Sequence, residues 1–202
     1  LFIFLLSIFN IQLYRYTQET DICIGIPDAG RKKSFAKTIG FFINTLVMRT
    51  KLEENNGFLD FLQQTKNTVL AAFSHKDIPF EKIVEILKPE RSRNTNPFFQ
   101  TMFTMQNMPL KEIVLNNEVT AQRIDIDRGN TVCDLSLEIW EKEQALECYF
   151  EYSTELFKAS TIQRFSSHFE TLLKSILTNP QERVSHLEIL PAKEKHQLLY
   201  EF

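Results

Sequence analysis

The side chains that could carry chemistry in this chain are its histidines, cysteines and a few isolated polar groups. The four histidines lie far apart, and none has the partner at helical spacing that an H-E-x-x-H zinc motif requires. The three cysteines form no close pair, so neither a zinc site nor a disulfide framework is expected. Phosphate-binding loops, G-x-G-x-x-G fingerprints and G-x-S-x-G elbows are also missing from the sequence. These motifs therefore indicate no metal enzyme, nucleotide-binding enzyme or serine hydrolase.

Four polar residues interrupt or border apolar segments. Asn44 lies inside the apolar run 39–49, which ends on Arg49. Asp77 precedes Pro79 at the expected start of a short helix, where its carboxylate could cap the free backbone amides. Asp134 precedes a strand with alternating apolar residues, where a turn or capping role is the default expectation.

The elements that must position these residues follow from apolar periodicity. Helices are expected over 1–14, 58–69, 79–87, 160–178 and 192–200, the fourth opened by a capping box at Ser160 and Gln163. Strands are expected over 21–27, 99–106, 119–126, 135–140 and 146–152, the last two as a hairpin. This interleaving predicts an α/β or mixed α+β class, with a mixed sheet and flanking helices.

Composition limits the possible partners. The chain has 202 residues, 43% of them apolar and 24% charged, which is typical of a globular protein. A net charge of −3 without a basic stripe argues against nucleic-acid binding. The apolar start, 1–9, is too short to span a bilayer, so no membrane association is expected. Unpaired cysteines fit a reducing compartment, and we predict a cytoplasmic location.

Three segments together carry a family resemblance. Residues 39–49 (IGFFINTLVMR) are similar to I-G-x-F-V-N-T-x-x-x-R, and residues 75–81 (HKDIPFE) match H-x-D-x-P-F-E. Residues 91–100 (RSRNTNPFFQ) resemble R-D-x-S-R-N-P-L-F-Q, with Ser92 and Thr95 departing from that pattern. Residues 25–31 (GIPDAGR) resemble G-x-P-x-A-G-R. In this order, the segments resemble the C-terminal half of a condensation domain from a nonribosomal peptide synthetase.

The resemblance implies a fold and a reaction. The fold is the C-terminal lobe of a two-lobed, chloramphenicol acetyltransferase-like domain, here over residues 1–180, with 181–202 as a linker toward an adenylation domain. In the family, an acceptor aminoacyl thioester attacks a donor thioester in a tunnel between the lobes. Phosphopantetheine arms of upstream and downstream carrier proteins tether both substrates, and no cofactor binds directly. The catalytic H-H-x-x-x-D-G motif does not occur in this sequence and is expected upstream of residue 1, in the N-terminal lobe.

The resemblance also assigns residues. Asn44, Arg49 and Asp134 are the candidates for lining the tunnel, with Asn44 and Arg49 expected on or beside the central strand. The alternatives are an Asn44 amide that satisfies backbone groups and an Arg49 ion pair at a strand end. A second catalytic base at His75 is not favoured. The remaining motif residues are expected to be structural: Gly40, His75, Asp77, Pro79, Phe80, Arg91, Asn96 and Pro97.

Two other functions stay open. The piece could act as a non-catalytic module that docks a carrier protein. A heterocyclisation-type domain is distinguished mainly by the upstream motif, whereas epimerisation is disfavoured because residues 39–44 lack V-G-W-F-T. Under the main hypothesis, peptide-bond formation is an activity of the complete synthetase, and the chain alone is expected to be inactive.

Overall fold

The computed structural model describes residues 1–53, 55–90, 95–106, 113–116, 119–121, 126 and 129–201. Its main sheet has five strands in the order β2-β1-β3-β6-β7. Their bounds are β1 Asp21–Asp28, β2 Asn44–Lys51, β3 Thr101–Gln106, β6 Leu135–Glu141 and β7 Leu146–Tyr152. A separate two-stranded sheet consists of β4 Ile113–Asn116 and β5 Val119–Ala121. The mixed sheet with flanking helices confirms the predicted class.

The pairing of the main sheet is mixed. β1 and β2 are antiparallel, as are β6 and β7, whereas β3 pairs in parallel with both β1 and β6. The carboxyl ends of β1, β3 and β6 therefore point to the same end of the sheet. β2 is an edge strand, two strands from the central β3. The expectation that Asn44 and Arg49 lie on or beside the central strand is therefore wrong, because β1 separates β2 from β3.

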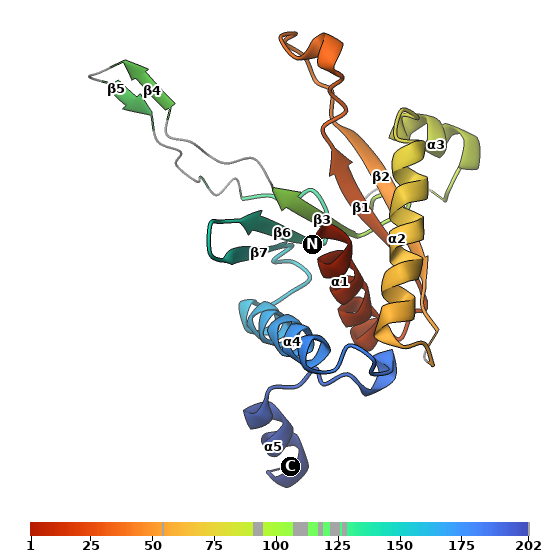
Figure 1. The fold of residues 1–202 in the computed structure, drawn as a ribbon, viewed down its shortest axis with the longest axis vertical. Helices are drawn as coiled ribbons and strands as arrows, with labels where there is room; N and C mark the ends of the chain where they lie inside the picture. Colours follow the sequence, from red (N-terminus) through yellow and green to blue (C-terminus); the bar gives the residue numbers. More distant parts are fainter. Residues whose placement is uncertain are drawn as a thin grey trace.

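Three long helices cover one face of the sheet. They are α1 Phe2–Thr17, α2 Phe58–Ser74 and α4 Ala159–Thr178, with α1 between the other two (Figure 1). α1 is apolar around most of its circumference, which suits a helix packed on several sides, and its residues 5–14 are all buried. Within the described residues, no helix is long and apolar enough to cross a membrane.

The remaining helices are short. α3 Phe80–Leu87 and α5 Ala192–Tyr200 have no buried residue, while η1 Lys33–Phe35 and η2 Val184–His186 are single 3₁₀ turns. Segment 181–190 packs on the body, with Val184, Leu187 and Ile189 buried. A role of residues 181–202 as a linker toward another domain stays a prediction.

Two predicted helix starts were wrong in their detail. α4 begins at Ala159 with Lys158 as its N-cap and no side-chain cap bond, so Ser160 is inside the helix and forms no capping box. α3 also lacks a local side-chain cap, because Pro79 occupies the N-cap position where Asp77 was expected to act. Both errors concern only the first turn, and the helices themselves were predicted correctly.

Candidate functional site

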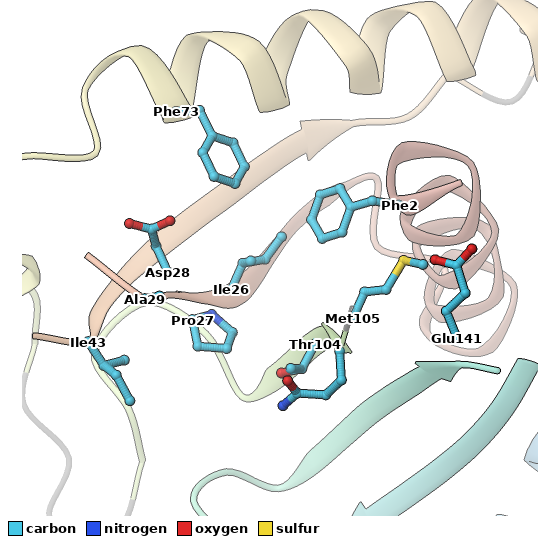
Figure 2. Close-up of a pocket in the computed structure, with 11 residues that line it drawn as sticks. Phe2, Ile26, Pro27, Asp28, Ala29, Ile43, Phe73, Thr104, Met105 and Glu141 are labelled. Atoms are coloured by element: carbon cyan, nitrogen blue, oxygen red, sulfur yellow. The ribbon is translucent and has the colours of Figure 1, made fainter. Parts of the chain in front are cut away.

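A concavity that combines strands and helices lies at the carboxyl ends of β1, β3 and β6. It has a volume of about 550 Å³ and opens beside the first turn of α1 and the last turn of α2. Figure 2 shows its walls, which are mostly apolar with a few polar groups. The lining side chains are Phe2, Ile26, Pro27, Asp28, Ala29, Ile43, Phe73, Thr104, Met105, Gln106 and Glu141. This composition and the position at the ends of parallel strands are typical of a ligand pocket.

Asp28 is the last residue of β1, and its carboxylate contributes to the wall on the helix-covered side. Its Oδ2 atom accepts the backbone N–H of Gly30 at 3.0 Å and lies 3.5 Å from Nζ of Lys76. Gly30 has φ of +60°, a conformation that glycine adopts without a steric cost. Asp28 was not predicted from the sequence, because it occupies a variable position of G-x-P-x-A-G-R and no spacing links it to the other lining residues.

Asn44 is the first residue of β2, next to the lining residue Ile43. Its Nδ2 donates to the carbonyl oxygens of Lys76 at 2.9 Å and Ile78 at 2.8 Å. Its Oδ1 accepts the N–H groups of Thr45 at 2.9 Å and Phe80 at 3.0 Å. The half-buried amide therefore satisfies backbone groups, as one of the two alternatives predicted. A role in lining a substrate tunnel stays a prediction.

Arg49 lies near the other end of β2, about 17 Å from Asn44 at the usual rise per strand residue. It donates from Nε to Asp21 Oδ1 at 2.8 Å and from Nη2 to Asp21 Oδ2 at 2.7 Å. This bidentate pair confirms the predicted ion pair at a strand end. The hydrogen bond from Arg49 lowers the pKa of Asp21 and raises that of Arg49 itself.

The second motif surrounds the turn between α2 and α3. His75 and Asp77 are exposed, and Asp77 pairs with Lys32 at 3.0 Å instead of capping α3. The backbone N–H of Phe80, at the start of α3, is bonded to Asn44. Pro79 is the N-cap of α3, as its missing N–H allows. Gly40 lies in the exposed connection between β1 and β2.

The third motif packs against the second. The ring of Phe80 contacts those of Phe98 and Phe99, with centroid distances of 6.0 and 5.8 Å. Asn96 Nδ2 donates to the carbonyl of Val132 at 3.2 Å, and Pro97 is half-buried. Arg91 lies outside the described residues. The rings of Phe80, Phe98 and Phe99 therefore join the second motif to the third.

Asp134 is separated from the other two tunnel candidates. It lies in a bend directly before β6, and its backbone carbonyl accepts the N–H of Ser153 at 3.0 Å. The pairing of Leu135 with Thr101 and of Thr101 with Ile24 places Asp134 at the amino end of the parallel strands. The pocket is at their carboxyl ends, so the structure does not bring Asn44, Arg49 and Asp134 into one site.

A polar cluster connects α1, α4 and α5 near the carboxyl-terminal end of α1, whereas the pocket lies beside the first turn of α1. His168 in α4 is 6% exposed, and its Nδ1 lies 2.6 Å from the hydroxyl of Tyr16 and its Nε2 2.7 Å from Oε2 of Glu194. Burial, followed by the charge of Glu194, raises the pKa of Tyr16 to about 12. The cluster was missed in the sequence because its members belong to α1, α4 and α5. Its position away from the pocket indicates a structural role.

Metal and thiol chemistry receive no support from the described part of the chain. Its His, Cys, Asp and Glu side chains form no group of three or more that could hold a metal. Burial raises the pKa of the thiols of Cys23 and Cys133, which keeps them protonated at neutral pH.

Comparison with known proteins agrees with the sequence motifs and with the fold. The family model "Condensation domain" matches residues 2–199. Two relatives from Brevibacillus parabrevis match the whole chain. A subunit of linear gramicidin synthase is 39% identical to it, and tyrocidine synthase 2 is 37% identical. The chain spans only 4% and 6% of these two relatives.

Solved structures share the fold. A four-domain nonribosomal peptide synthetase, holo-AB3403 bound to AMP and glycine, has a TM-score of 0.86 at 22% identity, over 96% of this chain and 16% of that one. The X-domain from teicoplanin biosynthesis has a TM-score of 0.84 at 23% identity, over 94% and 44%. Given the ordered motifs, the mixed sheet and the match over nearly its whole length, the chain belongs to the condensation domain family of nonribosomal peptide synthetases.

Proposed function

We propose that this chain forms one wall of the tunnel in which a condensation domain joins two carrier-bound substrates. The observation that carries the proposal is the cavity of about 550 Å³ at the carboxyl ends of three parallel strands. Its apolar walls can enclose an acyl chain and the methylene groups of a thioester arm, while Thr104 and Gln106 offer hydrogen bonds. Asn44, next to the lining residue Ile43, fixes the start of β2 to the turn before α3.

The proposed reaction is aminolysis of a thioester. The acceptor amine nitrogen bonds to the donor carbonyl carbon, the carbon–sulfur bond breaks, and the phosphopantetheine thiol leaves with the proton lost by the amine. Because the thioester is already activated, alignment of the two substrates supplies much of the rate enhancement. The base that receives the amine proton is expected in the H-H-x-x-x-D-G motif of the other lobe, and this chain holds and orients the substrates.

Several partners follow from this proposal. Carrier proteins deliver both substrates on phosphopantetheine arms, the N-terminal lobe completes the tunnel, and an adenylation domain follows segment 181–202. The relatives are synthetase proteins many times longer than the chain, which supports this setting. The phosphopantetheine arms act as tethers of the substrates, and we expect no directly bound cofactor.

A reconstitution experiment tests the proposal. Donor-loaded and acceptor-loaded carrier proteins are mixed with either this chain or the synthetase module that contains it, and products are identified by mass spectrometry. We expect a peptide product with the module only. A module that makes the same product after residues 1–180 are deleted would contradict the proposal. Carrier binding to the chain, together with a module that makes no product, would instead support the non-catalytic docking role.

A further inference from the structure

We infer that Asp28 gives the cavity a preference for a cationic nitrogen on the aminoacyl group that it binds. The inference rests on the proposed function, because it assumes that the cavity receives a carrier-bound aminoacyl or peptidyl group. It goes further in naming the charge of the substrate and the residue that selects it. Asp28 and Glu141 are the acidic residues of the described lining, which contains no lysine, arginine or histidine.

The two carboxylates lie on opposite sides of the cavity. Figure 2 shows Asp28 at one side and Glu141 at the other, with Ile26, Met105 and Phe2 between them. The side chain of Asp28 is only 12% exposed, whereas Glu141 is exposed at the end of β6. Asp28 is therefore the carboxylate that loses most of its hydration to the surrounding apolar wall.

The internal partners of Asp28 leave half of its carboxylate available. Both the Gly30 amide and Lys76 approach Oδ2, and no described residue donates a hydrogen bond to Oδ1. Lys76 is 46% exposed and 3.5 Å away, so solvent screens its charge and it compensates Asp28 weakly. A cationic ligand nitrogen could donate to Oδ1 from inside the cavity, where a charge-assisted hydrogen bond is strong.

A neutral ligand would have the opposite effect. Filling the cavity with an apolar side chain would remove water from Oδ1 and supply no donor, and an unpaired carboxylate in an apolar site is costly. The preference therefore arises both from attraction of a cation and from a penalty on its neutral counterpart. We expect a cationic ligand to bind about tenfold more tightly than a neutral one of the same size.

The structural role of Asp28 can be separated from its charge. The bond from Gly30 to Oδ2 forms a turn in which asparagine can replace aspartate, because the Oδ1 of an asparagine accepts the same N–H. Asp28→Asn therefore keeps the turn and removes the charge. Asp77→Asn is the matched control, since it removes the same charge from an exposed carboxylate outside the cavity.

The cationic nitrogen could be the α-ammonium of an acceptor or a charged side chain, and three pantetheine amide probes distinguish them. N-acetyl-lysyl pantetheine presents only a side-chain ammonium, free-amine norleucyl pantetheine only an α-ammonium, and N-acetyl-norleucyl pantetheine neither. Binding to the 202-residue chain is measured by NMR titration, with circular dichroism as the check on folding of each variant. We expect at least one cationic probe to bind about tenfold more tightly than the neutral probe.

The two variants then test whether Asp28 causes the preference for a cation. In Asp28→Asn the affinities of the cationic and the neutral probes should come within about twofold of each other, while Asp77→Asn should keep the difference of the natural chain. Equal binding of all three probes to the natural chain would overturn the inference and leave the proposed function standing. A preference that persists in Asp28→Asn would overturn the assignment to Asp28. If no probe bound at all, the result would count against the inference and against a substrate cavity in this lobe.

Discussion

The Oδ1 atom of Asn44 accepts the N–H of Phe80 at 3.0 Å, so a residue at the start of β2 caps helix α3 from 36 positions away. The same amide donates to the carbonyls of Lys76 and Ile78 in the preceding turn. One side chain therefore fixes a strand, a turn and a helix start relative to one another. This relationship connects the first two sequence motifs and borders the cavity through Ile43.

Removing this cap should destabilise the fold. We expect Asn44→Ala to lower the free energy of unfolding by about 1–3 kcal/mol, because it leaves partly buried backbone groups without partners. Urea denaturation gives the total effect, and hydrogen exchange at the Phe80 amide locates it. Asn67→Ala is the control, since the Asn67 side chain accepts a hydrogen bond from exposed Gln63 on α2. Equal stabilities of the two variants would refute the capping role.

Gly25 allows β1 to approach the third motif. A Cβ atom at this position would lie 2.5 Å from the buried ring of Phe99. Gly25→Ala should therefore cost about 1–3 kcal/mol through overpacking. Phe99→Leu made in the same chain should recover part of that loss, and a double-mutant cycle from thermal unfolding measures the coupling. Strictly additive effects would show that the clash is relieved elsewhere.

Tyr16 should make stability depend on alkaline pH. Its pKa is raised to about 12 in the folded chain against 10.0 for an ordinary tyrosine, so the folded state binds the proton more tightly than the unfolded state. This contribution is fully present below pH 10 and is lost as the pH rises toward 12. Tyr16→Phe should flatten the alkaline part of the stability curve. Tyr200→Phe, at an exposed position of α5, controls for loss of a tyrosine.

Glu194 should control the attachment of α5. No residue of this helix is buried, so the hydrogen bond between His168 and the Glu194 carboxylate and the one from Lys195 to Glu188 hold it on the body. We expect Glu194→Ala to accelerate tryptic cleavage after Lys193 and Lys195 severalfold, since the helix is released from α4. Glu201→Ala, at the exposed end of the chain, should leave the cleavage rate unchanged. A slow rate in both variants would show that another contact secures the helix.

Arg49 should affect Asp21 and not the cavity. In Arg49→Ala the pKa of Asp21 should rise toward its ordinary value, which NMR titration of the carboxyl carbon can follow. The natural pair stabilises the fold above the ordinary pKa of aspartate, and that contribution is lost as the pH falls through the lowered pKa. Binding of the pantetheine probes should be unchanged. Weaker binding would instead place Arg49 in the tunnel.

The elements of this fold were predictable where they depend on local periodicity. The β6–β7 hairpin follows from alternating residues, and the alternating apolar residues Leu135, Leu137 and Ile139 of β6 are buried. The helix expected over 58–69 is likewise found as α2, whose buried residues Phe58, Phe61, Thr65 and Val69 recur at helical spacing. Such patterns are contained in a short segment, so they can be read from it directly.

The long-range contacts were not predictable in the same way. Asp77 was the nearest candidate to cap α3, and the cap comes instead from Asn44, which sequence distance hides. The cavity combines Phe2, Asp28, Phe73 and Met105 from four elements, and no motif spacing connects them. The placement of β3 between β1 and β6 also depends on pairing between distant segments.

That placement of β3 has a consequence for how the chain folds. The β6–β7 hairpin closes over a short turn, whereas β3 must find partners far from it on both sides of the chain. Its pairing with β1 is brief, from Ile24 with Thr101 to Gly25 with Met102. Closing such long loops is entropically slow. Insertion of β3 should therefore limit the refolding rate, and until it occurs the open edges of β1 and β6 are where chains would associate with one another.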